Sequence, residues 1–114
     1  MLFYPYMSPR SYSPVTVEAA RLLGARIRLA RREHRWTLEQ LAERVGVTRV
    51  TMRKVERGEP TVGLGVAFEA AAVLGVPLFH EDAARRRLEA RSIEDRLAVL
   101  PQSVREPAEV DDDF

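Results

Sequence analysis

The sequence predicts an all-α protein, because apolar residues recur at intervals of three or four along several successive segments. Threonines with helix-capping spacing precede these segments and glycines follow them, as at the ends of short helices. The chain has 114 residues, of which 46% are hydrophobic and 31% charged, a composition typical of one globular domain with terminal extensions. We therefore expect a compact helical domain with a C-terminal helical extension and flexible tails.

Residues 1–16 are expected to form a flexible arm before the first helix. The segment contains Pro5, Pro9 and Pro14 together with three serines, and proline removes a backbone donor that helices and ladders need. An arm without a binding role is the simpler expectation, and an ordered contact with a partner is the alternative.

The first two helices are predicted over residues 17–33 and between Thr37 and Gly46. In the first helix, apolar residues at helical spacing share the surface with several arginines, which gives the helix a basic face. The second helix has Thr37 as its N-cap and Gln40 three residues later, which is the pattern of a capping box, and it ends at Gly46.

Two further short helices are predicted. Thr48 is the expected N-cap of the third helix, which extends to about Arg57. Thr61 is the expected N-cap of the fourth helix, which carries the apolar run Leu64–Leu74 and is closed by Gly75. Four helices thus fit into a short stretch of chain.

Residues 17–80 are expected to form the folded domain, and residues 81–100 a helical extension in which a helix restarts at Ser92. The arginines 85–87 are expected to lie on a solvated face. The apolar residues of this region could cover the domain core or pair two protomers, and periodicity alone leaves both roles open. They are Leu78, Phe79, Leu88, Ile93 and Leu97.

The net charge of +1 conceals two halves of opposite sign. Residues 1–60 contain 12 Arg and Lys against 6 Glu, a charge of +6, whereas residues 61–114 contain 6 Arg against 11 Asp and Glu, a charge of −5. The basic half favours a polyanionic partner, and the acidic half favours a different role.

Two short helices joined by a tight glycine-containing turn, with basic residues on the second helix, are typical of a helix-turn-helix. The second helix of this motif fits the major groove of DNA. The residues expected to contact base edges are Arg49, Val50, Thr51, Arg53 and Lys54. Arg and Lys donate to guanine, and the chain has no asparagine for the usual adenine contact, so we expect a half-site read mainly at guanines.

Over about residues 17–79 the chain resembles the Cro and phage-repressor helix-turn-helix family, often called XRE. The resemblance lies in four stretches: Leu23–Arg31, Trp36–Arg49, Val55–Gly58 and Leu74–Val76. It implies a five-helix DNA-binding domain whose third helix enters the major groove. The phosphate-contacting residues that it implies are Thr37, Leu38, Thr48 and Arg57. The family often has Gln where this chain has Leu38, so only the backbone N–H of Leu38 could bind phosphate.

A narrower resemblance connects the chain with antitoxin repressors encoded beside HipA-type kinase toxins. It rests on Gly58–Gly65 and on the ending Val110–Phe114. It implies a repressor of its own operon that also neutralises a HipA-like kinase. The acidic tail, residues 101–114, would bind that partner through Asp111, Asp112, Asp113 and Phe114. The alternative is a stand-alone regulator without a toxin partner.

Enzymatic activity, a bound metal and a cofactor are not expected. The chain has no cysteine, its two histidines are isolated, and no catalytic combination of side chains stands out. No apolar run is long enough for a membrane span and no signal peptide is recognisable, so we expect a cytoplasmic protein. Trp36 is expected to pack in the core. The expected functional form is a homodimer on a double-stranded DNA operator.

Overall fold

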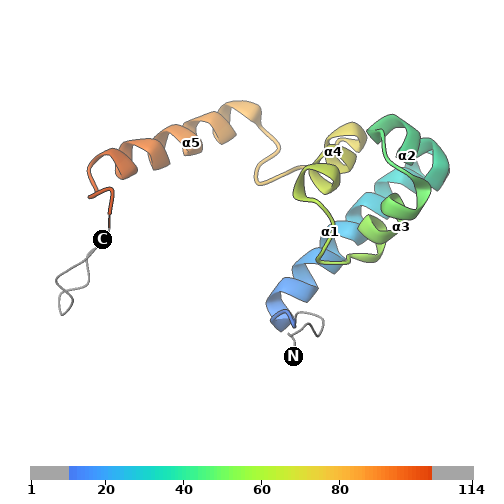
Figure 1. Ribbon diagram of the computed structural model, residues 1–114. Coiled ribbons are helices and arrows are strands. Elements are labelled where there is room, and N and C mark those ends of the chain that lie inside the picture. The colour runs from blue at the N-terminus through green and yellow to red at the C-terminus, as the bar shows by residue number, and fades with distance from the viewer. Residues whose placement is uncertain (1–10, 104–114) are drawn as a thin grey trace. The chain divides into compact units, whose positions relative to one another are not determined.

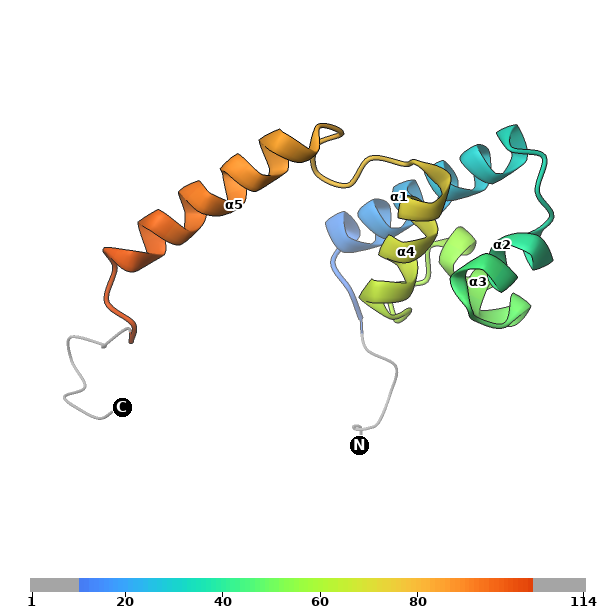
Figure 2. The same cartoon turned by 90° about the horizontal axis from the view of Figure 1, so that it is seen from above.

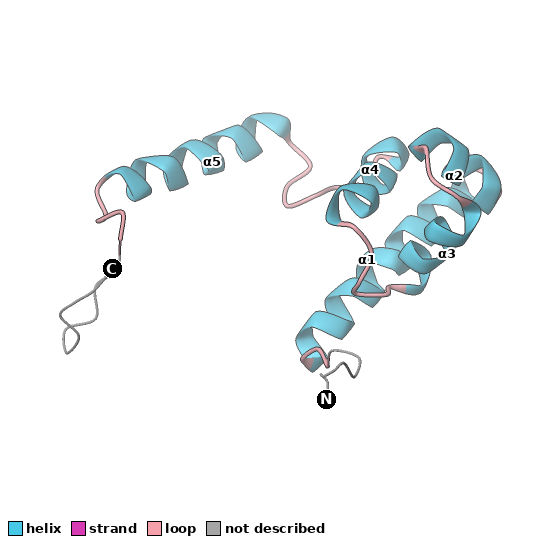
Figure 3. Cartoon of the chain, viewed as in Figure 1, coloured by secondary structure: helices cyan, strands magenta, loops and turns pink. Residues whose placement is uncertain are grey.

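The computed structural model describes residues 11–103, which form five α-helices and no strand (Figures 1 and 3). The helices are α1 (Pro14–Glu33), α2 (Leu38–Val45), α3 (Arg49–Arg57), α4 (Leu64–Leu74) and α5 (Ala83–Ala98). The chain divides between Leu78 and Phe79 into two units, with α1 to α4 in the first and α5 in the second. The predicted all-α fold is confirmed. The tail residues Asp111 to Phe114 lie outside the described residues.

Helix α1 begins three residues earlier than the expected Val17. Ser13 is its N-cap, and the Ser13 hydroxyl oxygen accepts a hydrogen bond from the Thr16 N–H at 3.3 Å. Pro14 occupies the first turn, where a helix needs no N–H donor and the fixed φ of proline suits the helix. The proline that we expected to interrupt helix formation therefore starts the helix.

The predicted starts of α2 and α3 are confirmed by their capping hydrogen bonds. The Thr37 hydroxyl oxygen accepts from the Gln40 N–H at 3.0 Å, and Gln40 Oε1 accepts from the Thr37 N–H at 2.8 Å. The Thr48 hydroxyl oxygen accepts from the Thr51 N–H at 3.2 Å. Gly46 ends α2 in the left-handed conformation, so that only three residues connect the two helices.

Two other predicted helix starts are wrong. The N-cap of α4 is Gly63 rather than Thr61, because Thr61 lies in a turn that the Val62 N–H closes on the Glu59 carbonyl at 3.3 Å. Helix α5 does not restart at Ser92. Asp82 caps it upstream by accepting from the Ala84 N–H at 2.9 Å, and the helix then continues without a break to Ala98.

The core of the first unit is formed by one face of each of its four helices. Helices α1 and α2 each pack against α3 and α4, and Figure 2 shows the long α1 lying along the side of the other three. The buried residues are Ile27, Leu41, Ala42, Met52, Val55, Ala67, Ala70, Ala71 and Leu74. Trp36 and Leu78 are half-buried against this core, so Trp36 packs as expected and Leu78 is assigned to the core.

Glycines bring the backbones of α1 and α3 into direct contact. A Cβ atom added to Gly24 would lie 2.5 Å from the carbonyl oxygen of Val55. A Cβ atom added to Gly58 would lie 2.5 Å from the Cα of Arg21, and Gly58 also has a φ of +74°. Since the obstructing atoms belong to the backbone, no side-chain movement can make room for a larger residue.

We predict that Gly24→Ala lowers the free energy of unfolding by about 1–3 kcal/mol, the usual cost of forcing an atom into a packed site. Gly65→Ala is the matched control, because nothing lies within 4 Å of its Cβ position and alanine favours a helix. Urea unfolding of both variants tests this. A Gly24→Ala variant as stable as the Gly65→Ala variant would contradict the close approach.

Candidate nucleic-acid interface

Helix α3 has one buried and one exposed face. Met52, Val55 and Glu56 point into the first unit. The opposite face is exposed and carries residues at the helical spacings i, i+1, i+4, i+5 and i+8: Arg49, Val50, Arg53, Lys54 and Arg57. Four of the five residues predicted to contact bases therefore lie on one surface, together with the predicted phosphate contact Arg57. We call these five residues the α3 face.

Thr51, the fifth predicted base contact, lies at the edge of the α3 face. It is half-buried, and its hydroxyl oxygen accepts a hydrogen bond from the Thr48 hydroxyl at 3.1 Å. Thr48 itself is exposed at the N-terminus of α3. These two hydroxyl groups are thus engaged with each other and with the first turn of the helix.

The predicted phosphate contacts at α2 differ in their surroundings. Thr37 is exposed, whereas Leu38 is half-buried with its side chain packed against the core. Thr37 and Arg49 line the same shallow hollow between α2 and the start of α3. Two carboxylates, Glu39 and Glu43, line it as well, so the positive charge is concentrated on the α3 face rather than in the hollow.

The basic side chain at the C-terminal end of α3 is weakly paired. Arg57 Nε lies 3.9 Å from Glu59 Oε2, and the Arg57 side chain is 60% exposed. An exposed ion pair at this distance holds its guanidinium loosely. Arg57 is therefore available to a ligand at the surface.

A buried ion pair that the sequence did not predict holds α3 against α1. Arg31 Nε donates to Glu56 Oε2 at 2.6 Å and Arg31 Nη2 donates to Glu56 Oε1 at 3.0 Å. The exposed fractions of the two side chains are 12% and 6%. The third nitrogen, Nη1, donates to the carbonyl oxygen of Trp36 at 2.9 Å. One guanidinium thus connects α1, the loop before α2 and α3.

This pair was not predicted because the arginines of the first helix, Arg31 among them, were expected to lie on an exposed basic face. The spacing of Glu56 contained a usable signal, since Glu56 follows Met52 by four residues and Val55 by one on the buried side of α3. A carboxylate on a buried face requires a cationic partner. Arg44 is also not a free surface charge, because its guanidinium carbon lies 4.1 Å from the centre of the Trp36 ring.

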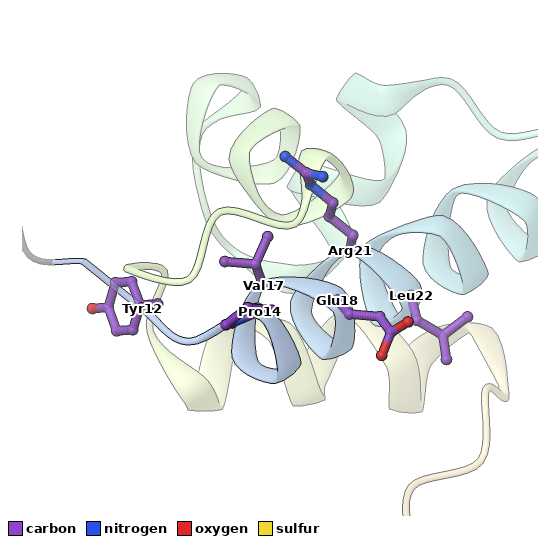
Figure 4. A pocket seen from close by; sticks show the side chains of 6 residues that line it. All are labelled: Tyr12, Pro14, Val17, Glu18, Arg21 and Leu22. Carbon is purple, nitrogen blue, oxygen red and sulfur yellow. The ribbon is translucent and has the colours of Figure 1, made fainter.

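A second hollow, at the start of α1, does not belong to this surface. Figure 4 shows its six lining residues, which are Tyr12, Pro14, Val17, Glu18, Arg21 and Leu22. None of them is a predicted DNA contact. Within residues 11–103 no three metal-ligating side chains cluster together, and no helix there is long and apolar enough to cross a membrane.

We predict that Glu56→Ala lowers the free energy of unfolding by about 3–5 kcal/mol, because it leaves the Arg31 guanidinium buried without its partner. Glu59→Ala, which removes the exposed partner of Arg57, is the control and should change stability by less than about 0.5 kcal/mol. Thermal or urea unfolding measures both variants. Equal effects would show that the buried pair has no special role.

Comparison with known proteins gives a family match for part of the chain. Residues 27–80 match a family model described as helix-turn-helix. The comparisons with curated proteins and with solved structures gave no match. The matched segment includes α2, the turn, α3 and α4, and it contains every residue predicted to contact DNA. The match supports the resemblance to the Cro and phage-repressor family. Residues 27–80 therefore form a helix-turn-helix domain, which indicates a DNA-binding transcriptional regulator.

Proposed function

We propose that the protein is a sequence-specific transcriptional repressor that binds a double-stranded DNA operator as a homodimer. The observation that carries this proposal is the α3 face, on which four cationic side chains and Val50 are exposed. The opposite face of the same helix is buried in the core. A rigidly held helix with a basic outer face suits the major groove, where base edges present distinct patterns of donors and acceptors.

The positions of the side chains on α3 suggest separate roles. Arg49, Arg53 and Lys54 can donate to O6 and N7 of guanine, and Val50, which is 60% exposed, can contact the methyl group of thymine. Thr51 remains a proposed contact at the edge of this face, through its methyl group. A half-site read mainly at guanines follows from this composition.

Phosphate contacts would fix the register of α3 on the duplex. The start of α2 offers the Thr37 hydroxyl and the N–H of Leu38, and within residues 11–103 no hydrogen bond uses that N–H. Thr48 begins α3 and Arg57 ends it, so that contacts from both ends of the helix could hold it in the groove. A dimer bound at an operator that overlaps a promoter would block transcription without any further activity.

We predict that Arg49→Ala weakens binding to the specific operator by about 1–3 kcal/mol and relaxes selectivity at one base position. Arg57→Ala should instead weaken binding to all sequences by a similar factor, because a phosphate contact carries no base information. Selection of bound sequences from a random library, followed by titration of operator and scrambled duplexes, measures both effects.

The salt dependence of affinity provides the control for this assignment. A dimer that neutralises about six to eight phosphates should show a slope of log affinity against log salt of roughly −5 to −7. Arg57→Ala should make this slope less steep. An affinity that does not change with salt would contradict the proposal, as would an Arg57→Ala variant that alters base preference.

A second candidate function is that of an antitoxin that also neutralises a HipA-like kinase toxin. The acidic ending Asp111–Phe114 and the charge of −5 over residues 61–114 favour it. A tail with one aromatic anchor can become ordered on the surface of a partner. In this proposal residues 17–80 bind DNA, residues 81–100 form the extension and residues 101–114 bind the toxin. A stand-alone regulator is the alternative.

We predict that deletion of residues 101–114 abolishes toxin binding and leaves DNA affinity unchanged, if the antitoxin function holds. The measurement is co-purification of the full-length and the shortened chain with a HipA-like kinase from the native cell extract, with nuclease present to remove bridging DNA. Equal recovery of the kinase with both chains would reject a role for the tail. Absence of the kinase from both would leave a stand-alone repressor.

A further inference from the structure

Helix α5 carries apolar side chains that nothing else in the described part of its own unit, residues 79–103, covers. None of its residues is buried. Ile93 and Leu97 are 47% and 55% exposed, and Leu100, two residues after the end of the helix, is 58% exposed. A single helix of 16 residues is only marginally stable in water, because its packing rather than its length normally supplies stability. The apolar side of α5 therefore needs a partner.

The apolar residues of α5 follow the spacing of a coiled-coil seam. Positions separated alternately by three and four residues face one partner helix. These positions are occupied by Ala83, Arg86, Ala90, Ile93, Leu97 and Leu100. Arg86 is the one charged member. Its Nη1 donates a hydrogen bond to the carbonyl oxygen of His80, which lies in the segment before the helix, so the guanidinium has a polar partner outside the seam. Leu88 lies outside this seam.

The charged residues beside the seam are arranged to suit a second copy of the same helix. One edge carries Arg87 and Glu94, and the other edge carries Glu89 and Arg96. Within residues 11–103 none of these four side chains forms an ion pair. Each edge therefore has one positive and one negative group available for a partner.

The direction of pairing follows from these charges. In an antiparallel pair with Ala90 facing the partner's Ile93, Arg87 lies beside the partner's Glu94 and Glu89 lies beside the partner's Arg96. The two-fold axis repeats both contacts, giving four opposite-charge pairs. In a parallel pair, Glu89 would lie beside the partner's Glu94 and the two copies of Arg86 would face each other. Like charges thus disfavour the parallel arrangement.

We infer that α5 joins two copies of this chain as an antiparallel coiled coil with Ala90 opposite the partner's Ile93. The inference rests on the homodimer of the proposed function and supplies its interface. A 16-residue helix is about 24 Å long at 1.5 Å per residue. With Ala90 opposite the partner's Ile93, the two Asp82 residues are 19 residue rises apart, or about 28 Å along the pair. In each chain, residues 75–82 connect α4 to this helix start. Two helix starts at this separation are compatible with two DNA-binding units on half-sites about 34 Å apart.

The first test measures the dimer dissociation constant of the full-length chain, without DNA, by sedimentation equilibrium. Leu97→Glu places a charge in the seam and should weaken the dimer at least about tenfold. Leu88→Glu changes a leucine of similar exposure (65% against 55% for Leu97) outside the seam and should leave the constant unchanged. Circular dichroism of both variants shows whether α5 remains helical. Equal dimerisation of the Leu97→Glu and wild-type chains would overturn the inference.

The second test distinguishes the antiparallel from the parallel pair. Glu94→Arg places arginine beside the partner's Arg87 in the antiparallel pair, and should weaken the dimer roughly tenfold. In a parallel pair the same change would create an attraction to Glu89 and strengthen the dimer, which would overturn the inferred direction. Asp95→Arg makes the same charge change away from the seam and should have little effect. Arg87→Glu combined with Glu94→Arg should restore the wild-type constant.

Because the chain contains no cysteine, disulfide formation gives an independent reading of the register. Chains with Ala90→Cys and with Ile93→Cys are mixed and oxidised. The inferred pair gives mainly the mixed 90–93 dimer, whereas a parallel pair gives mainly the 90–90 and 93–93 dimers and contradicts the inference.

DNA binding separates the failure of this inference from failure of the proposed function. A monomeric Leu97→Glu chain should still bind a single half-site with wild-type affinity and should lose cooperative binding to a two-half-site operator. If wild-type chain binds no DNA while α5 still dimerises, the proposed repressor fails and the interface stands. If DNA binding is normal and no measured variant changes the dimer constant, the interface fails and the repressor stands.

Discussion

The orientation of α3 depends on the buried ion pair between Arg31 and Glu56. Two charged groups removed from water lose several kcal/mol of solvation each, and they recover this only when their hydrogen bonds are made in good geometry. Here both carboxylate oxygens accept from Arg31, at 2.6 and 3.0 Å, and the remaining guanidinium nitrogen donates to the Trp36 carbonyl. A rotation of α3 about its axis would break these bonds. With Glu56 fixed inward, the side chains of the α3 face are fixed outward.

The glycine contacts restrict α3 in a different way. The ion pair determines which side of α3 faces α1, whereas Gly24 and Gly58 determine how closely the two helices approach. At Gly24 the carbonyl oxygen of Val55 occupies the space that a side chain would need. At Gly58 the Cα atom of Arg21 occupies that space. Helix α1 thus contacts α3 along its length by backbone and by charge. A helix held in both rotation and distance presents its outer side chains in one geometry, as recognition of base edges requires.

Much of the fold could be predicted from local signals, because capping bonds involve residues three apart. Thr37 with Gln40 and Thr48 with Thr51 behave as their spacing predicted. The prediction that Thr61 caps a helix was wrong because the same residue can also lie in a turn, and here the hydrogen bond between Glu59 and Val62 forms that turn. Most of the α3 face followed from periodicity. The Arg31–Glu56 pair could not be found in this way, since its partners are 25 residues apart and meet only after α1 and α3 pack.

The arginines of this chain have four kinds of surroundings that net charge does not distinguish. Arg31 forms a buried ion pair and Arg44 covers the Trp36 ring. Fewer positive charges therefore face outward than the charge of residues 1–60 suggests. On the α3 face all charges have one sign, which suits a polyanion and repels a second copy of the same surface. Helix α5 carries both signs on each edge of its seam, which suits a second copy of itself and offers little to a phosphate backbone. The opposite patterns therefore fit the proposed division of roles, in which α3 reads DNA and α5 pairs two copies of the chain.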